Sequence, residues 1–168
     1  LKYLDDIFGA RIQTLMSNDA AIEEAVAEAD LVIGSVLIPG KKAPKLMKRE
    51  YLKSMKHGSV IVDVAIDQGG CCETSKVTYH DAPTYVVDNV VHYCVGNMPG
   101  AVPRTSTLAL TNATFKYGLQ IADLGLEKAC IANDVIYSGI NTYNGMITCK
   151  NVADSFDMTW QDPREIIK

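Results

Sequence analysis

Two runs of apolar residues without polar alternation constrain the fold more than any other feature of the chain. The first is LVIGSVLI at residues 31–38, which ends at Pro39-Gly40, and the second is VIVDVAI at residues 60–66. Such runs are typical of parallel strands covered on both faces, because neither face then displays polar side chains. An apolar stripe at helical spacing lies between them and ends at Gly58. This strand–helix–strand order predicts an α/β fold with an open parallel sheet and a right-handed crossover.

Further elements extend this pattern in both directions. Ser17-Asn18-Asp19 offers side-chain oxygens that can cap a helix before the first strand, and residues 85–87 form a third, weaker strand. Later in the chain, Thr105-Ser106 can cap a long helix that ends at Gly125. A second helix is expected near residues 127–138.

The character of the chain changes near residue 100. Pro99-Gly100 and Pro103 predict a stiff bend, and helical periodicity replaces the strand runs beyond it. The dipeptide Asn144-Gly145 predicts a turn near the end. We therefore expect a sheet-containing part in residues 1–100 and a helical part in residues 101–168.

Composition excludes several classes of protein. Of the 168 residues, 48% are hydrophobic and 21% charged, which is too apolar for a disordered chain. No apolar run reaches the ~18 residues of a membrane-spanning helix. With 16 basic and 20 acidic side chains the net charge is −4, which argues against nucleic acids and anionic membranes as partners. The densest basic stretch, residues 41–49, is interpreted as a solvated loop and helix start.

The cysteines point to a reducing compartment. Their number is odd and no C-x-x-C motif occurs, so neither a disulfide framework nor a zinc site fits, and no metal ligand is predicted. Together with the lack of a recognisable signal peptide, this predicts a cytoplasmic protein with reduced thiols. Because the sequence starts at Leu1 within a structured segment, we expect a fragment of a longer chain. The cysteines are Cys71, Cys72, Cys94, Cys130 and Cys149.

Residues that could carry chemistry follow the two predicted strands. Ligands of open parallel sheets bind beyond the carboxyl ends of the strands. Val36 and Leu37 come at the end of the first strand, and Asp67 comes at the end of the second. Asp67 could equally be a turn-forming aspartate. Gly69-Gly70 is a weak candidate for a phosphate cradle, because no G-x-G-x-x-G motif occurs in the chain.

Residues 92–105 are a third candidate region. His92, on an apolar strand, is interpreted as a core histidine with satisfied hydrogen bonds. Cys94 is interpreted as a small buried hydrophobe, since no cation is placed nearby in the sequence to lower its pKa. Met98 could pack in the core or lie against a flat ring.

At these residues the sequence resembles a known family. VDVAIDQGGC at residues 62–71 and HYCVGNMPGAVPRTST at residues 92–107 are similar to signature segments of bacterial L-alanine dehydrogenases. Residues 29–46 and 108–114 are similar to the family too, so that the resemblance extends over the whole chain. The related transhydrogenase subunit resembles the chain less, because it usually has Glu and Asn at the positions of Asp67 and Cys71.

The resemblance implies a fold and a reaction. Residues 1–100 would form the second half of a Rossmann-type NAD-binding domain, and residues 101–168 would return to the substrate domain as helices. The reaction would be the NAD-dependent oxidative deamination of L-alanine to pyruvate and ammonium.

The resemblance also implies site residues. Asp67 would be the catalytic carboxylate, working beside a histidine from the N-terminal part of the enzyme. The positions implied to bind NAD are Ser17 near the adenosine, Val36 and Leu37, then Val64, Ala65, Ile66 and Asp67, and finally Val95, Gly96, Asn97 and Met98 in a segment that closes over nicotinamide and substrate.

Partners and alternatives follow from the same resemblance. The glycine-rich phosphate turn and the substrate-carboxylate ligands would lie in the N-terminal part, so we expect residues 1–168 alone to be inactive. The family usually assembles as a homo-oligomer, often a hexamer. Two alternatives remain open at this stage: a transhydrogenase α-subunit-like protein, and a non-catalytic module that binds nucleotide or mediates assembly.

Overall fold

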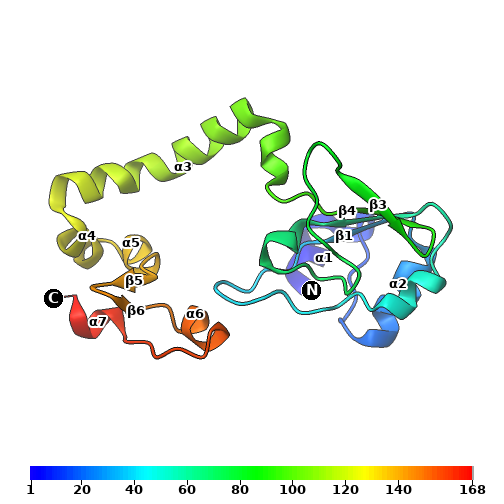
Figure 1. Ribbon diagram of the computed structural model, residues 1–168, viewed down its shortest axis with the longest axis horizontal. Coiled ribbons are helices and arrows are strands. Elements are labelled where there is room, and N and C mark those ends of the chain that lie inside the picture. Colours follow the sequence, from blue (N-terminus) through cyan, green and yellow to red (C-terminus); the bar gives the residue numbers. More distant parts are fainter. Residues whose placement is uncertain (168) are drawn as a thin grey trace. The chain divides into compact units, whose positions relative to one another are not determined.

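The chain divides into two compact units, each described here by itself. The computed structural model describes residues 1–167. The first unit comprises Leu1–Leu37 and Ala43–Gly96, and the second comprises Ile38–Lys42 together with the chain from Asn97 onward (Figure 1).

The first unit is built on a four-stranded sheet in the order β1-β2-β4-β3. Strands β1, β2 and β4 are parallel, and β3 pairs antiparallel with β4 at one edge. The expected α/β fold with a mainly parallel sheet is therefore confirmed. The strands are β1 (Leu31–Gly34), β2 (Val60–Asp63), β3 (Thr84–Val87) and β4 (Val90–Tyr93).

The third parallel strand differs from the prediction. Residues 85–87 lie in β3, which is antiparallel, whereas the parallel neighbour of β2 is β4. The two strands form a tight hairpin through Asp88 and Asn89, which have φ values of 50° and 65°. Asn and Asp adopt the left-handed region more readily than other residues with a Cβ, so this pair permits the two-residue turn.

Strands β1 and β2 are both shorter than the apolar runs from which they were predicted. β2 ends at Asp63, and the chain continues as the 3₁₀ helix η3 (Val64–Gln68). The Asp63 carboxylate accepts the backbone N–H of Ala65 and so starts the helical turn. In β1, Leu31 and Ile33 are more than half exposed, so the expectation that this strand is covered on both faces is wrong for the described residues.

The helices of the first unit that precede β2 are α1 (Lys2–Phe8), η1 (Gly9–Arg11), α2 (Asp19–Glu28) and η2 (Arg49–Lys53). Of these, α2 and η2 pack against the sheet, because their residues share a core cluster with Ile61 of β2. Of the three residues predicted to offer a cap, Ser17, Asn18 and Asp19, it is Asn18 that caps α2, and its side chain accepts the N–H of Ala21 at 2.9 Å. The predicted helix between the first two strands is reduced to η2.

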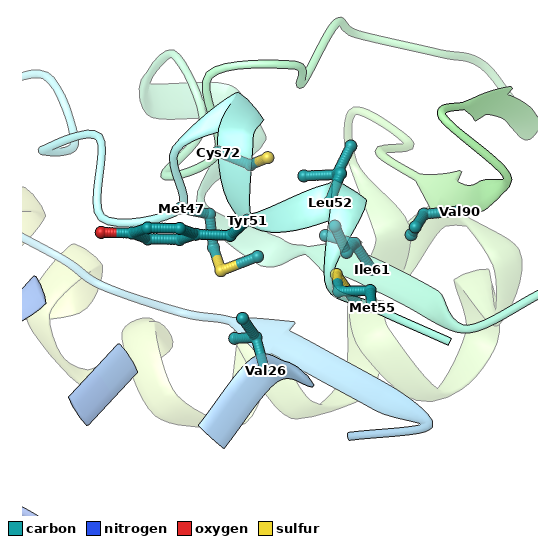
Figure 2. Packing of buried hydrophobic residues seen from close by; sticks show 8 residues of the cluster. All are labelled: Val26, Met47, Tyr51, Leu52, Met55, Ile61, Cys72 and Val90. Atoms are coloured by element: carbon teal, nitrogen blue, oxygen red, sulfur yellow. The ribbon is translucent and has the colours of Figure 1, made fainter. Parts of the chain in front are cut away.

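The core of the first unit lies between η2, α2 and the sheet. Figure 2 shows its side chains, with Leu52, Met55 and Ile61 close together. Tyr51 and Leu52 come from η2 and are almost fully buried. The cluster consists of Val26, Met47, Tyr51, Leu52, Met55, Ile61, Cys72 and Val90.

The second unit is mostly helical. Its elements are η4 (Met98–Ala101), α3 (Pro103–Leu124), α4 (Leu126–Ala132), α5 (Asp134–Ser138), β5 (Thr142–Tyr143), β6 (Met146–Ile147), α6 (Lys150–Ser155) and α7 (Pro163–Ile166). Its core cluster contains Ala129, Cys130, Ile136 and Ile167. Within residues 1–167, no helix is long and apolar enough to cross a membrane.

The helix boundaries observed in this unit differ in part from those predicted from the sequence. α3 begins at Pro103 rather than after Thr105-Ser106, because proline is suited to the first turn of a helix. Ser106 instead donates its hydroxyl hydrogen to the Pro99 carbonyl at 2.8 Å. α3 ends before Gly125 as predicted. The helix predicted over residues 127–138 is broken at Asn133 into α4 and α5.

Candidate functional site

Two adjoining hollows lie at the carboxyl ends of β1 and β2, in the first unit. The larger, of about 320 Å³, is bounded by the start of α2 and by the end of β1, and is called the α2 hollow. The smaller, of about 290 Å³, is called the Asp67 hollow. Ser35 and Val36 line both, so the two hollows adjoin along the end of β1. The Asp67 hollow is lined by Ser35, Val36 and Leu37 after β1 and by Val64, Ala65, Asp67 and Gln68 in η3.

The Asp67 hollow thus brings together five of the residues singled out from the sequence. They come from two strand ends that are neighbours in the sheet, through the register in which Gly34 lies opposite Asp63. Carboxyl ends of parallel strands meet at one sheet edge, which is where open α/β sheets bind ligands. The five residues are Val36, Leu37, Val64, Ala65 and Asp67.

Ser17, the sixth, lines the α2 hollow together with Ala21 and Ile22 of α2. The lining of the α2 hollow is mostly apolar. Gly34 forms part of the floor and has no room for a side chain, since a Cβ there would lie 2.1 Å from Cys71 Sγ. The glycine lets the β1 end and Cys71 approach closely.

Asp67 presents its carboxylate at the surface. Its side chain is exposed, and among residues 1–167 it makes no hydrogen bond or ion pair. Gly96 lies beside it, because a Cβ added at Gly96 would be 3.4 Å from Asp67 Oδ1. An accessible carboxylate at a strand end can accept a hydrogen bond from a donor outside this unit.

Gln68, next to Asp67, has an unsatisfied polar atom. Its Oε1 is buried and has no hydrogen-bond partner within the described part of the chain. Buried acceptors are usually paired, so this oxygen suits an N–H donor that enters the Asp67 hollow.

Gly69-Gly70 has a different role from the one considered. The two residues have φ values of 92° and 73°, which favour glycine. A Cβ at Gly70 would lie 2.7 Å from Asp63 Oδ2 and 2.9 Å from Ser75 Cβ. At Gly70 the close backbone approach is therefore made to the protein's own buried carboxylate, which accounts for this glycine without a phosphate.

The remaining predicted residues fall into two groups. Val95 is fully buried and Ile66 is 3% exposed, so both belong to the interior of this unit and neither lines the Asp67 hollow. Asn97 and Met98 belong to the second unit. There Asn97 precedes η4 in a left-handed conformation and lines a separate hollow with Pro99 and Pro103.

His92 and the cysteines of the first unit form part of the interior. Burial lowers the pKa of His92, whose Nδ1 lies 3.0 Å from the Val90 carbonyl and whose Nε2 lies 2.7 Å from Thr74 Oγ1. Burial and the neighbouring Asp63 raise the pKa of Cys71 to about 12. Cys94 is fully buried. The interpretation of His92 and Cys94 as core residues is confirmed.

Four residues of this region were missed from the sequence. Ser35 and Gln68 flank predicted positions and were passed over because neither belongs to a recognisable motif. Lys45 lies exposed in a loop, as the solvated-loop prediction has it, and its ammonium group in addition donates to three backbone carbonyls. Asp63 did carry a signal, because a charged residue inside an apolar strand run needs buried partners. Within residues 1–167 no cluster of His, Cys, Asp or Glu could hold a metal ion.

The parallel sheet with hollows at its carboxyl edge defines an α/β domain of the Rossmann-like class. A family model described as "Alanine dehydrogenase/PNT, C-terminal domain" matches residues 1–150. The chain belongs to this family.

Named relatives agree with this assignment. The chain is similar to "Alanine dehydrogenase 2" of Staphylococcus aureus strain USA300, with 54% identity over all of this chain and 45% of the relative. The same protein of strain MRSA252 is 54% identical over 99% of this chain. A solved structure titled "L-alanine dehydrogenase" superimposes with a TM-score of 0.78 and 50% identity, covering 93% of this chain and 43% of that one. The chain thus spans less than half the length of these relatives.

Proposed function

We propose that this chain is the C-terminal part of an NAD-dependent alanine dehydrogenase. The reaction takes L-alanine, NAD⁺ and water to pyruvate, ammonium, NADH and a proton. The observation that carries the proposal is the pair of adjoining hollows at the carboxyl edge of the sheet, with the accessible Asp67 carboxylate at one end. The relatives named alanine dehydrogenase supply the substrate.

The residues present fit a dinucleotide. The apolar α2 hollow, with Ser17 at its rim, suits an adenosine, and the adjoining Asp67 hollow suits a nicotinamide ring. The unpaired Oε1 of Gln68 is an acceptor for the carboxamide N–H₂. Val36, Leu37 and Val64 provide an apolar wall, and Asn97 and Met98 are proposed as further residues that bind the cofactor.

The chemistry that NAD⁺ supplies when bound is acceptance of the hydride from the alanine Cα. The chain's own contribution is to exclude water and to place a carboxylate near the reacting carbon. Asp67 is proposed to accept a hydrogen bond from an acid–base histidine in the N-terminal part. A carboxylate in that position orients the imidazole and raises its pKa, so that it can shuttle protons during hydration of the imine.

The rest of the enzyme completes the site. We assign residues 1–100 to the second half of the nucleotide domain and residues 101–168 to the substrate domain. The N-terminal part would supply the phosphate turn and the ligands of the substrate carboxylate, so residues 1–168 alone should not turn over alanine. We further assign the enzyme to the cytoplasm, in keeping with five free cysteines, and to a homo-oligomer such as a hexamer.

The test is a pair of variants in the full-length protein. Asp67→Asn should lower kcat for NADH formation from L-alanine by at least ~100-fold, while the Kd for NAD⁺ changes by less than ~3-fold. Asp81→Asn, an exposed aspartate of the same unit, is the matched control and should keep wild-type kcat. A wild-type protein that forms no NADH from alanine contradicts the proposed reaction. An Asp67→Asn variant within a few-fold of wild type removes Asp67 from the mechanism.

A further inference from the structure

Asp67 stands on an element that has little stability of its own. η3 has five residues, and 3₁₀ helices of this length have strained hydrogen bonds and few of them. Catalytic groups must nevertheless be held within about 0.5 Å of the productive geometry. The surroundings of η3 therefore have to fix it.

The start of η3 is fixed by the buried carboxylate of Asp63. Besides the N–H of Ala65, this carboxylate accepts the N–H groups of Cys71 and Cys72 at 2.9 and 3.2 Å and the hydroxyl of Ser75 at 2.6 Å. Asp63 is fully buried. It joins the first turn of η3 to the segment that returns after Gly69-Gly70.

The end of η3 is fixed by the ammonium group of Lys45. Its Nζ donates to the carbonyls of Gly69, Gly70 and Cys72 at 2.6, 2.9 and 3.1 Å. An ammonium group has three N–H donors, so all of them are used. The positive charge also lies at the carboxyl end of a helical turn, where a cation is favourable. Close by, Ala43 donates its N–H to the Gln68 carbonyl at 2.9 Å.

We propose that Lys45 is a positioning residue for Asp67, holding the turn at Gly69 and Gly70 so that the carboxylate keeps its place at the sheet edge. This inference rests on the proposed function of Asp67. Lys45 lies 22 residues before Asp67 and touches neither its side chain nor, in our assignment, the substrate. Its effect on catalysis is exerted through the backbone that follows Asp67.

The first experiment measures Lys45→Met in the full-length enzyme. We expect kcat for alanine oxidation to fall by about 10-fold or more, because small displacements of a catalytic group are costly. The Kd for NAD⁺ should change by less than ~3-fold. Lys53→Met is the matched control, since Lys53 is exposed in the same unit and makes no hydrogen bond or ion pair among residues 1–167. It should keep the wild-type kcat.

The second experiment separates positioning from general stability. In an Asp67→Asn background, Lys45→Met should lower kcat by no more than ~2-fold, since the group it positions is already disabled. In the wild-type background, Lys45→Met should also lower the pKa seen in the acidic limb of the kcat profile, as the misplaced carboxylate no longer favours the imidazolium. Should the methionine variant not fold, Lys45→Gln carries the same measurements, since its amide is uncharged and its nitrogen ends one atom short of the position of Nζ.

The outcomes are distinct. Full additivity of the two substitutions, or a Lys45 variant within ~2-fold of wild type while Asp67→Asn is inactive, overturns the inference and leaves the proposed function standing. An Asp67→Asn variant with nearly normal kcat overturns both.

Discussion

The two units of the chain bury their apolar side chains to very different extents. In the first unit, Leu52 of η2 is 1% exposed and lies in a cluster of eight buried residues. In the second unit, the 22-residue helix α3 has no buried residue, and Leu110 on it is 67% exposed. Leu52 thus lies within a core of the first unit, whereas α3 packs on the core of the second unit through partly buried residues such as Tyr117 and Ile121.

The largest expected effect tests this contrast directly. Leu52→Ala should lower the free energy of unfolding by about 2–5 kcal/mol, because it removes buried methyl groups and leaves a cavity. Leu110→Ala in α3 is the matched control and should change it by less than ~0.5 kcal/mol. Urea unfolding of residues 1–168 measures both. Equal losses for the two substitutions would mean that α3 is covered, and the contrast would fail.

The next effect concerns the close approach of Gly34 to Cys71. Gly34→Ala should cost about 1–3 kcal/mol, since its Cβ would lie 2.1 Å from Cys71 Sγ. The double variant Gly34→Ala/Cys71→Ala removes that sulfur and should be no less stable than Cys71→Ala alone. Urea unfolding of the four proteins gives the coupling free energy. A coupling near zero would show that the backbone, rather than the sulfur, limits this position. Gly118, in the middle of α3, has nothing within 4 Å of an added Cβ and provides the control in the second unit.

A cap at the start of α2 gives a smaller effect. Asn18→Ala removes the acceptor of the Ala21 N–H and should cost about 1 kcal/mol. Because α2 contributes Val26 to the core, the loss should appear in the unfolding of the whole first unit. Asn18→Asp keeps the acceptor and is the control. An alanine variant as stable as wild type would mean that water replaces the cap.

Patterns that are local in the sequence predicted the fold well, and contacts between distant residues were predicted poorly. Apolar runs located β1 and β2, and Gly125 marked the end of α3, because each depends on residues a few positions apart. The end of β2 was missed because it is decided by the Asp63 carboxylate, which captures the Ala65 N–H.

The site shows the same limit. Strand ends pointed to Val36, Leu37 and Asp67, since parallel strands bring their carboxyl ends together. The clamp made by Lys45 was not visible, because it joins an ammonium group to backbone carbonyls 24 to 27 positions away. Because every residue type has a backbone carbonyl, no sequence motif predicts a contact of this kind.

The smallest expected effect is a pH dependence confined to the first unit, which contains all three histidines. Val90 offers only a carbonyl, so His92 Nδ1 is the donor and the neutral ring accepts from the Thr74 hydroxyl at Nε2. Burial lowers the pKa of His92 below its ordinary value of 6.5. Between that lowered pKa and 6.5 the unfolded chain binds a proton that the folded chain does not, so stability should decrease as the pH falls below about 6.5. Urea midpoints of residues 1–168 measured from pH 7.5 to 5.5 should show this slope in the wild type and in His57→Gln, an exposed control, and a flatter slope in His92→Gln. If His92→Gln kept the wild-type slope, the pH dependence of stability would come from groups other than His92. If the pH-dependent transition were the unfolding of α3, the pH dependence would belong to the second unit and the prediction would be wrong.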